Sequence, residues 1–527
     1  MRRRQLVAAG ASVAGSTLVA PYVRSATASS TIRFVPQADL SSLDPVWTTA
    51  TVAFNHGFLV YDSLYAVDET LTPQPQMVAG HETGDDGLTW TFTLRDNLLF
   101  HDNEPVRAAD CVASINRWGK RRGFGQKLLS LTNEMVALDD KRFRIRLKSP
   151  FPLMTFALGG PDICFVMPQR SAEVDPFKQV TDPTGSGPFR FLPGERVSGS
   201  FTAWAKWEKY VPREEKPSYW AGGKAANVDR VEWRIVGDPS TALSALQNGE
   251  VDWVENPVFD LLPKLRSDRN VRLMRVDPLF FPAMIALNHT QPPFDNEKLR
   301  RAILPAVDQA EFMTSLVGDE KDLMFVPTGA FTPNTPSAND RDMAAFTGKR
   351  DIALARRLVA ESGYKGEPVV LMAPSDQAVL VPLCQVANSL FKAIGLNVDF
   401  QIMDWGTLVG RRASDKKASE GGWNSFVTSW GGLSVSNPGS HLPLRGNGKA
   451  GWFGWPEGPE MEALRDRWFT ASDAAAQKVV CEEMQALAFR EVPFVPIGSY
   501  GIPQAMRANV EGVVQAGNTP FWNVRKT

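Results

Sequence analysis

The sequence predicts an α/β protein built from several domains. Segments that alternate polar and apolar residues, as half-buried strands do, are interspersed with segments whose apolar residues recur at helical spacing. The two kinds mix along the whole chain, with no internal repeat and no long low-complexity linker. At roughly 100–200 residues per domain, 527 residues with 43% apolar side chains correspond to about three domains with buried cores.

The first clear elements lie between residues 89 and 147. Residues 89–94 (TWTFTL) and 141–147 (KRFRIRL) alternate polar and apolar side chains, which predicts two half-buried strands. Between them, residues 108–120 place apolar side chains near a period of 3.6, and this spacing predicts a helix.

Helix ends are most clearly marked after residue 237. Asp238 supplies an N-cap, Pro239 suits the first helical position, and Gly249 follows the last turn. A helix is therefore predicted between Asp238 and Gly249, and residues 251–255 return to a strand.

Three more helices are predicted farther along the chain. The first covers residues 295–303, and Pro305 is expected to end or kink it. Residues 376–394 and 472–490 are long and amphipathic, and a strand over residues 397–403 follows the former.

The N-terminus has the pattern of a secretory signal peptide. Arginines at positions 2–4 precede an apolar run over residues 6–20, and Ala-Thr-Ala at 26–28 forms a cleavage site, so cleavage is expected near Ala28. The run is shorter than the roughly 20 residues of a spanning helix. We expect a periplasmic protein, with the twin-arginine and general secretion routes both open.

The net charge and the cysteine spacing argue against two kinds of binding, to nucleic acid and to a metal cluster. With 57 basic and 58 acidic side chains, the net charge of −1 argues against a nucleic-acid partner. Cys111, Cys164, Cys384 and Cys481 show no metal-ligand spacing. Export would allow two disulfides, but the apolar neighbours of each cysteine favour buried free thiols.

The common catalytic motifs are missing. No second zinc ligand follows His81-Glu82, and Lys449 lacks both the spacing and the following hydroxyl of a phosphate-binding loop. Gly185-Ser186-Gly187 runs into a proline rather than a nucleophile elbow. We therefore expect neither an enzyme nor a cofactor, although paired glycosidase carboxylates depend on separation in space and leave a secreted hydrolase as an alternative.

Five stretches in a fixed order carry a resemblance to a known family. They are SLDP at 42–45 with VYDSL at 60–64, residues 77–117 with DDGLTWTFTLRDNLLFHDNEPVRAADCVASINR, TGSGPF at 184–189, residues 218–255, and residues 288–308. Together they resemble the solute-binding proteins of peptide/nickel-type ABC importers, the family 5 extracellular proteins, over nearly the whole chain after the signal peptide.

This resemblance implies a two-lobed periplasmic-binding-protein fold of class II (cluster C), with an extra domain inserted in the first lobe. The first lobe would comprise residues 29–70, 186–278 and 494–527, the inserted domain 71–185, and the second lobe 279–493. A monomer would capture a small solute by hinge closure and deliver it to an ABC permease and its ATPase. A nickel or metal-chelate importer component and a ligand-presenting chemoreceptor partner are the alternatives.

The resemblance also implies ligand contacts on the second lobe. Trp405 and Trp430 are expected to stack on the ligand, and Arg412 to clamp a carboxylate or other anion, with Arg411 as the fallback. Ordinary core packing for Trp405 and a surface ion pair for Arg412 are the alternative interpretations.

Six further residues complete the expected site. Glycines would let backbone N–H groups approach the ligand, and polar side chains would face it from the first lobe. These residues are Gly431, Gly432, Thr48, Thr49, Asn55 and His56. A purely structural role is the alternative for His56.

One departure from the family pattern bears on the ligand. Peptide-binding members carry an aspartate three residues past the second tryptophan, where this chain has Leu433. A buried ammonium without that partner is costly. We therefore expect a small solute that is anionic or aromatic, or a modified peptide, and the choice between peptide, organic acid and metal chelate stays open.

Overall fold

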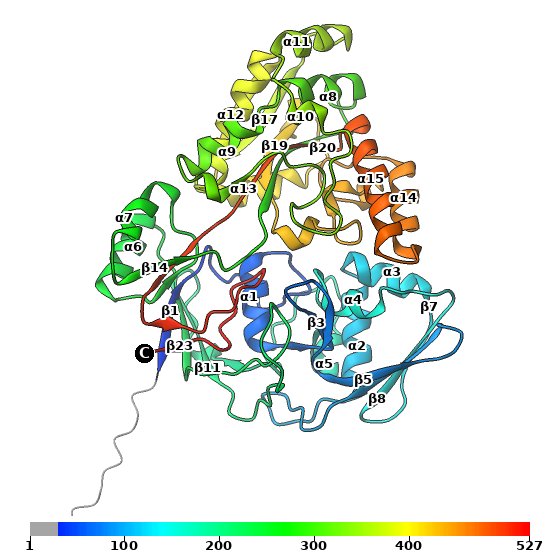
Figure 1. The fold of residues 1–527 in the computed structure, drawn as a ribbon, viewed down its shortest axis with the longest axis vertical. Helices are drawn as coiled ribbons and strands as arrows, with labels where there is room; N and C mark the ends of the chain where they lie inside the picture. Colours follow the sequence, from blue (N-terminus) through cyan, green and yellow to red (C-terminus); the bar gives the residue numbers. More distant parts are fainter. Residues whose placement is uncertain (1–29) are drawn as a thin grey trace, which may run out of the picture.

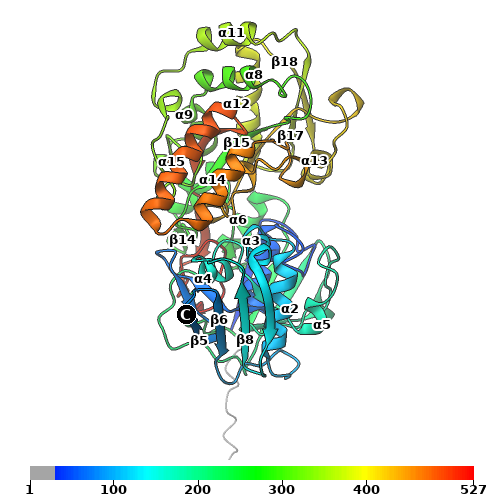
Figure 2. The ribbon, with the colours of Figure 1, turned by 90° about the vertical axis from the view of Figure 1, so that its right-hand side faces the viewer.

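The computed structural model describes residues 30–527, so the predicted signal peptide, residues 1–28, lies outside the described part. Two lobes are stacked along the long axis of the molecule, with the inserted domain beside the lower lobe (Figures 1 and 2). Within residues 30–527, every helix is too short or too polar to cross a membrane. The predicted two-lobed α/β fold is confirmed.

The first lobe is built on a seven-stranded sheet. Its strands, in spatial order, are β10 (Phe189–Phe191), β11 (Phe201–Lys206), β12 (Arg230–Arg234), β1 (Thr31–Val35), β13 (Trp253–Val254), β21 (Gln504–Arg507) and β14 (Val271–Met274). Its helices are α1 (Thr51–Val60), α6 (Pro239–Asn248) and α7 (Leu262–Arg266). Because β1 is parallel to β12 and β13, these three strands end at the same edge of the sheet.

The inserted domain has an antiparallel four-stranded sheet covered by helices. The strands are, in order, β5 (Val78–Thr83), β6 (Thr89–Leu94), β8 (Arg142–Leu147) and β7 (Thr132–Ala137). The helices are α2 (Ala108–Gly119), α3 (Gly123–Leu131), α4 (Met154–Gly159) and α5 (Gln169–Ala172). The alternation in β8 places every second side chain in the core, which confirms the predicted strand.

The second lobe has a mixed six-stranded sheet. Its strands, in order, are β16 (Met324–Phe325), β20 (Phe494–Tyr500), β15 (Phe281–Leu287), β19 (Ser425–Ser429), β17 (Pro368–Pro374) and β18 (Asn397–Met403). Its helices are α8 (Glu297–Ile303), α9 (Gln309–Val317), α10 (Ala344–Thr347), α11 (Ile352–Glu361), α12 (Leu380–Ala393), α13 (Trp405–Arg412), α14 (Pro459–Thr470) and α15 (Ala474–Glu491). Strand β17 is parallel to β18 and β19.

Short two-stranded ladders complete the fold. They pair β2 (Asp62–Ser63) with β9 (Phe165–Val166), β3 (Tyr65–Val67) with β4 (Pro73–Pro75), and β22 (Val510–Glu511) with β23 (Arg525–Lys526).

The chain crosses between the lobes twice. Strand β14 of the first lobe leads into β15 of the second, and β20 of the second leads back into β21 of the first. Because β20 belongs to the second-lobe sheet, that lobe extends to Tyr500, past the predicted boundary at residue 493. The crossings touch, because a Cβ placed on Gly501 would lie only 2.7 Å from Nε of Arg275. These two segments form the connection about which the lobes can hinge.

Helix starts follow the capping residues. Asp238 accepts a hydrogen bond from the Thr241 N–H, and Gly249 adopts a left-handed φ of 78°, as predicted for α6. Helix α8 begins after Asn296, which caps it. Helix α12 begins four residues later than predicted, because Asp376 accepts the backbone N–H of Trp405 instead of capping that helix.

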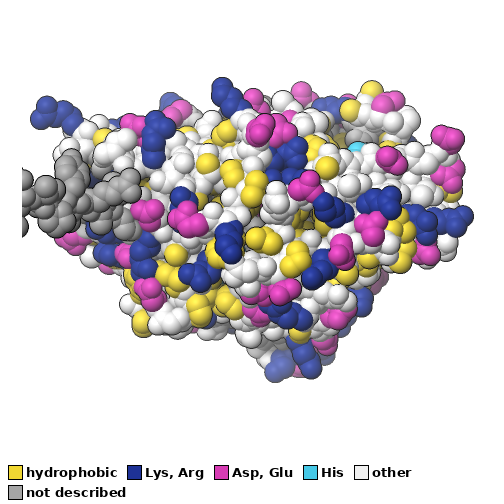
Figure 3. Space-filling view, turned by 90° about the horizontal axis from the view of Figure 1, so that it is seen from below, with side chains coloured by type: hydrophobic (Ala, Val, Ile, Leu, Met, Phe, Trp, Pro, Cys, Tyr) yellow, Lys and Arg dark blue, Asp and Glu magenta, His cyan; other side chains and the backbone are white. Residues whose placement is uncertain are grey.

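The described cysteines agree with the sequence analysis, and the surface charges of one face are mixed in sign. Cys111, Cys164, Cys384 and Cys481 are buried free thiols. The underside of the molecule intersperses basic and acidic side chains rather than gathering one sign (Figure 3).

Candidate functional site

The candidate site of the second lobe begins where parallel strands end. Strands β17, β18 and β19 bring their carboxyl ends to the same edge of the sheet. In open α/β sheets, ligands bind outside such carboxyl ends. Asp404 follows β18 and caps α13 by accepting the Thr407 N–H at 2.9 Å, and Trp405 is the first residue of that helix.

Arg412 lies between two aromatic rings. Its guanidinium carbon is 4.7 Å from the centre of the Phe453 ring and 5.7 Å from that of Trp405. Burial lowers the pKa of Arg412 to about 10, and its Nε has no hydrogen-bond partner. Among residues 30–527, no carboxylate forms a salt bridge with it. The surface ion pair considered from the sequence is therefore absent from this part of the chain.

Trp452 connects this arginine to the second predicted tryptophan. Its ring centre lies 5.3 Å from that of Trp430, at an interplanar angle of 67°, and 5.8 Å from that of Phe453. Trp430 is held by its backbone N–H, which donates to the Pro282 carbonyl at 3.0 Å. We call Trp405, Phe453, Trp452 and Trp430 the aromatic wall.

The structure thus brings the predicted Trp405, Arg412 and Trp430 together through two residues that sequence reasoning missed. Trp452 and Phe453 belong to the stretch GWFGWP at 451–456, and the density of aromatic residues between glycines was a usable signal. It lay outside the stretches that carried the family resemblance.

Arg411 does not fit the fallback role. Its Nε and Nη2 donate to the carbonyls of Gly421 and Gly422 at 2.9 and 2.6 Å, and Nη1 donates to Oε1 of Gln401 at 2.6 Å. Because these bonds hold the start of β19 against α13, the guanidinium has a structural role. The hydrogen bonds of Arg411 therefore disfavour the fallback prediction, in which it would replace Arg412 as the anion clamp.

The two glycines after Trp430 differ. A Cβ on Gly432 would lie 2.5 Å from the Phe280 carbonyl oxygen and 2.6 Å from Cβ of Leu279, so its small size serves packing against the lobe crossing. This corrects its predicted role in ligand approach. A Cβ on Gly431 would meet only Ser434 Oγ, at an ordinary contact distance of 3.9 Å, and Gly431 stays a candidate. Leu433 is buried, with 4% of its surface exposed.

His56 is part of the first-lobe core. It is fully buried, its Nδ1 accepts the Trp204 Nε1–H at 3.2 Å, and its ring packs against Phe191. Burial, with a smaller contribution from the Arg196 charge, lowers its pKa to about 3. The expectation that His56 faces the cleft is wrong, because apolar and aromatic groups enclose it.

Asn55 is also committed to the protein. Its Nδ2 donates to Glu255 at 2.8 Å, and its Oδ1 accepts from Asn518 Nδ2 and the Thr519 N–H at 3.0 and 3.1 Å. The side chain is completely buried. It positions the C-terminal segment beside β13 rather than presenting a free amide, which corrects the prediction of a ligand contact.

Thr48 and Thr49 remain near the surface. Thr48 is half-buried and Thr49 exposed, just before α1. The Thr48 carbonyl accepts Arg122 Nη2 at 2.7 Å, and its hydroxyl accepts the Ala50 N–H at 3.2 Å. These two residues stay candidates from the first lobe.

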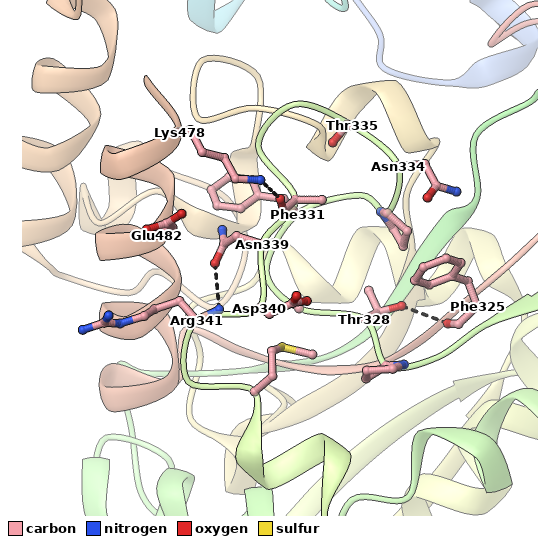
Figure 4. Close-up of a pocket in the computed structure, with 15 residues that line it drawn as sticks. Phe325, Thr328, Phe331, Asn334, Thr335, Asn339, Asp340, Arg341, Lys478 and Glu482 are labelled. Atoms are coloured by element: carbon pink, nitrogen blue, oxygen red, sulfur yellow. Dashed lines mark hydrogen bonds between the residues drawn. The ribbon is translucent and has the colours of Figure 1, made fainter. Parts of the chain in front are cut away.

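A cavity of about 590 Å³ lies elsewhere on the second lobe (Figure 4). The loop over residues 325–343 and helix α15 line it, including Phe331, Asn339 and Lys478. None of the predicted site residues lines this cavity. The aromatic wall and Arg412 therefore stay the candidate ligand site, separate from this cavity.

Two lobes joined by paired crossings, with an aromatic and cationic surface at a sheet edge, define the class of two-lobed solute-binding proteins. Residues 72–452 match the family described as bacterial extracellular solute-binding proteins, family 5 Middle. The chain belongs to this family. It is 37% identical to the probable peptide ABC transporter periplasmic-binding protein y4tO of Sinorhizobium fredii, over 99% of each chain.

More distant relatives share the length and the fold. The glutathione-binding protein GsiB of Pectobacterium atrosepticum is 23% identical over 99% of this chain and 97% of its own. A dipeptide-binding protein of Pseudoalteromonas sp. SM9913, solved with Met-Leu, has a TM-score of 0.78 at 19% identity, covering 94% and 100% of the two chains. AgaA of A. tumefaciens R10, solved with agropinic acid, has a TM-score of 0.77 at 20% identity, covering 94% and 99%.

Proposed function

We propose that this protein is the periplasmic binding component of an ABC importer and that it captures a small carboxylate-bearing solute between its lobes. It acts as a monomer, passes the solute to a membrane permease driven by a separate ATPase, and reaches the periplasm after cleavage near Ala28. Family membership and the 37% identical relative named as a peptide transporter protein support the importer role.

Arg412 carries the proposal for the ligand. A half-buried guanidinium that is flanked by rings, has an unpaired Nε and forms no salt bridge with a carboxylate has its charge unbalanced by the described protein. Burying an unpaired charge is costly unless a partner arrives. A ligand carboxylate fits this need, because guanidinium and carboxylate pair through two parallel charge-assisted hydrogen bonds.

The aromatic wall gives the rest of the ligand its character. Trp405 and Trp430 offer ring faces and apolar edges, which favour flat or apolar groups over a strongly hydrated chain. Leu433 supplies no charge for an α-ammonium. The ligand class is therefore an organic acid or a modified peptide, a range that the peptide, glutathione and agropinic acid in the names of relatives also span.

The test is native mass spectrometry of the exported protein purified without refolding, followed by identification of any released molecule. A carboxylate-bearing solute that is lost from an Arg412→Gln variant is expected. An unmodified peptide with a free amino group would overturn the ligand class but not the importer role. A released metal chelate would instead favour the nickel-type alternative.

A further inference from the structure

We propose that the inserted domain is the latch that holds the two lobes closed. Its helix α3 presents Phe124 to a socket on the second lobe formed by Gly439, Trp468 and Phe469. Both ribbon views place α3 next to α14, and Figure 1 shows β14, near the lobe crossings, on the opposite side of the molecule (Figures 1 and 2). We call this contact the latch seam.

Aromatic packing forms the centre of the latch seam. The ring of Phe124 lies edge-on to Phe469, with centroids 5.6 Å apart, and 6.1 Å from Trp468. Phe151 of the inserted domain reaches Phe469 at 6.2 Å. These rings are buried in a continuous apolar cluster that spans both lobes. Separating the lobes exposes them to water, so the seam opposes opening.

Two glycines let the backbones meet. A Cβ on Gly123 would lie 2.6 Å from the Gly439 carbonyl oxygen, and a Cβ on Gly439 would lie 2.3 Å from the Phe124 ring. Each glycine is thus matched to a group on the opposite lobe. Such reciprocal fit is what a specific docking contact requires, and incidental proximity does not produce it.

Charges surround the aromatic centre. Lys127 of α3 forms an ion pair with Asp466 of α14 at 2.7 Å, and its ammonium lies 5.4 Å from the Phe469 ring centre. Arg465 braces the socket from within the second lobe. It donates to the Pro438 and Gly439 carbonyls at 2.9 and 3.1 Å, and its guanidinium lies over Phe469.

The socket is continuous with the candidate ligand site. Trp430 of the aromatic wall begins the segment 430–441, which passes through a short 3-10 helix at Gly432–Val435 and reaches Gly439 at the seam. Nine residues of one segment therefore join Trp430 of the candidate ligand site to Gly439 of the socket. The latch adds to ligand contacts in favouring closure, and it acts in the ligand-free protein as well.

The test measures lobe separation without any ligand. Spin labels at Ser130→Cys and Ala463→Cys, both exposed positions on either side of the seam, report their distance distribution in the full mature protein. Phe124→Ala and Lys127→Glu are each expected to shift the population toward longer distances, with the open fraction rising about tenfold for loss of the Phe124 contacts. Adding Asp466→Lys to Lys127→Glu should restore the short distance.

Lys449→Glu is the matched control. Lys449 and Asp415 form an exposed ion pair of the same 2.7 Å length, but both lie in the second lobe. This variant should leave the distances unchanged. Circular dichroism confirms that each variant is folded, and the charge-swap pair keeps the test valid should Phe124→Ala unfold the inserted domain. Unchanged distances in folded Lys127→Glu, or no restoration by the swap, would overturn the latch.

Discussion

Arg411 and Arg412 adjoin in sequence and lie in opposite chemical environments. The guanidinium of Arg411 donates to two backbone carbonyls and an amide, whereas that of Arg412 lies over Phe453 with its Nε unpaired. One side chain completes the fold, and the other is available to a ligand.

This contrast predicts opposite effects of the same substitution. Arg412→Gln should weaken binding of the co-purified solute about tenfold to a hundredfold, as expected for one charge-assisted contact, and leave the melting temperature unchanged or raised. Arg411→Gln should lower the melting temperature and keep the affinity. Calorimetric titration and thermal melts of both variants separate the two roles, and a loss of affinity in both would contradict the assignment.

Phe453 should act through Arg412. Phe453→Leu keeps an apolar side chain of similar bulk but removes the ring face under the guanidinium, a contact worth about 0.5–2 kcal/mol. We expect a several-fold loss of affinity for the same solute with little change in stability. In the Arg412→Gln background the substitution should have no further effect, and an additive loss would show that Phe453 touches the ligand instead.

Gly431 and Gly432 offer a matched pair for stability. Gly432→Ala forces a methyl group into the Phe280 carbonyl and should cost about 1–3 kcal/mol of unfolding free energy. Gly431→Ala adds a methyl group whose one neighbour within 4 Å is Ser434 Oγ, at 3.9 Å, so the change in unfolding free energy should stay within about 0.5 kcal/mol. Urea unfolding of the two variants checks this, and equal losses would refute the packing role of Gly432.

Asp277 predicts a pH dependence at the first lobe crossing. Burial raises the pKa of Asp277 to about 7, although the hydrogen bond from the Leu279 N–H and the charge of Arg275 both act to lower it. Its Oδ2 has no hydrogen-bond partner. Because the native state holds this proton more tightly than the unfolded chain, the stabilisation is complete below about pH 4 and is lost as pH rises through 7.

Asp277→Asn keeps an oxygen acceptor for Leu279 and removes the titration. At pH 8 the unfolding free energy of the variant should exceed that of the parent by about 1–3 kcal/mol. Near pH 4 the two unfolding free energies should become equal. Denaturant unfolding across this range provides the measurement. Parallel stability curves for the two proteins would contradict the assignment.

The buried pair of Asp44 and Arg117 predicts a large loss. Their charged atoms lie 2.6 Å apart with almost no exposure, and Asp44 also accepts the Val180 N–H. Asp44→Ala leaves a buried cation unpaired and should destabilise the protein by about 3–5 kcal/mol. Chemical denaturation measures the loss, and a change below 1 kcal/mol would show that water reaches Arg117.

Local rules predicted the elements well and the site only in part. Strand β6 and the caps of α6 depend on neighbouring residues, so pattern and propensity were enough to predict them. The start of α12 failed because a distant backbone N–H, that of Trp405, engages Asp376. The residues around Asp376 give no sign that Trp405 competes with the start of α12 for this carboxylate.

The same difference between local pattern and distant partners explains which predicted site residues agree with the structure and which do not. Trp405, Arg412 and Trp430 were identified through the family resemblance, and in the structure each lies in or just after an element of the second lobe. His56 and Asn55 lie on α1 with no sequence sign that Trp204 and Glu255, far along the chain, enclose them. Burial of a polar residue is decided by partners remote in sequence, which a single chain does not reveal.

The touching crossings at Arg275 and Gly501 restrict how the molecule can move. Two connecting segments that did not touch would let one lobe slide, twist or tilt relative to the other. Two crossing segments that touch at Arg275 and Gly501 bend together, and this favours rotation of one lobe about a single axis. The gap at the far side then widens in proportion to that angle, so a single measured distance there reports the whole motion.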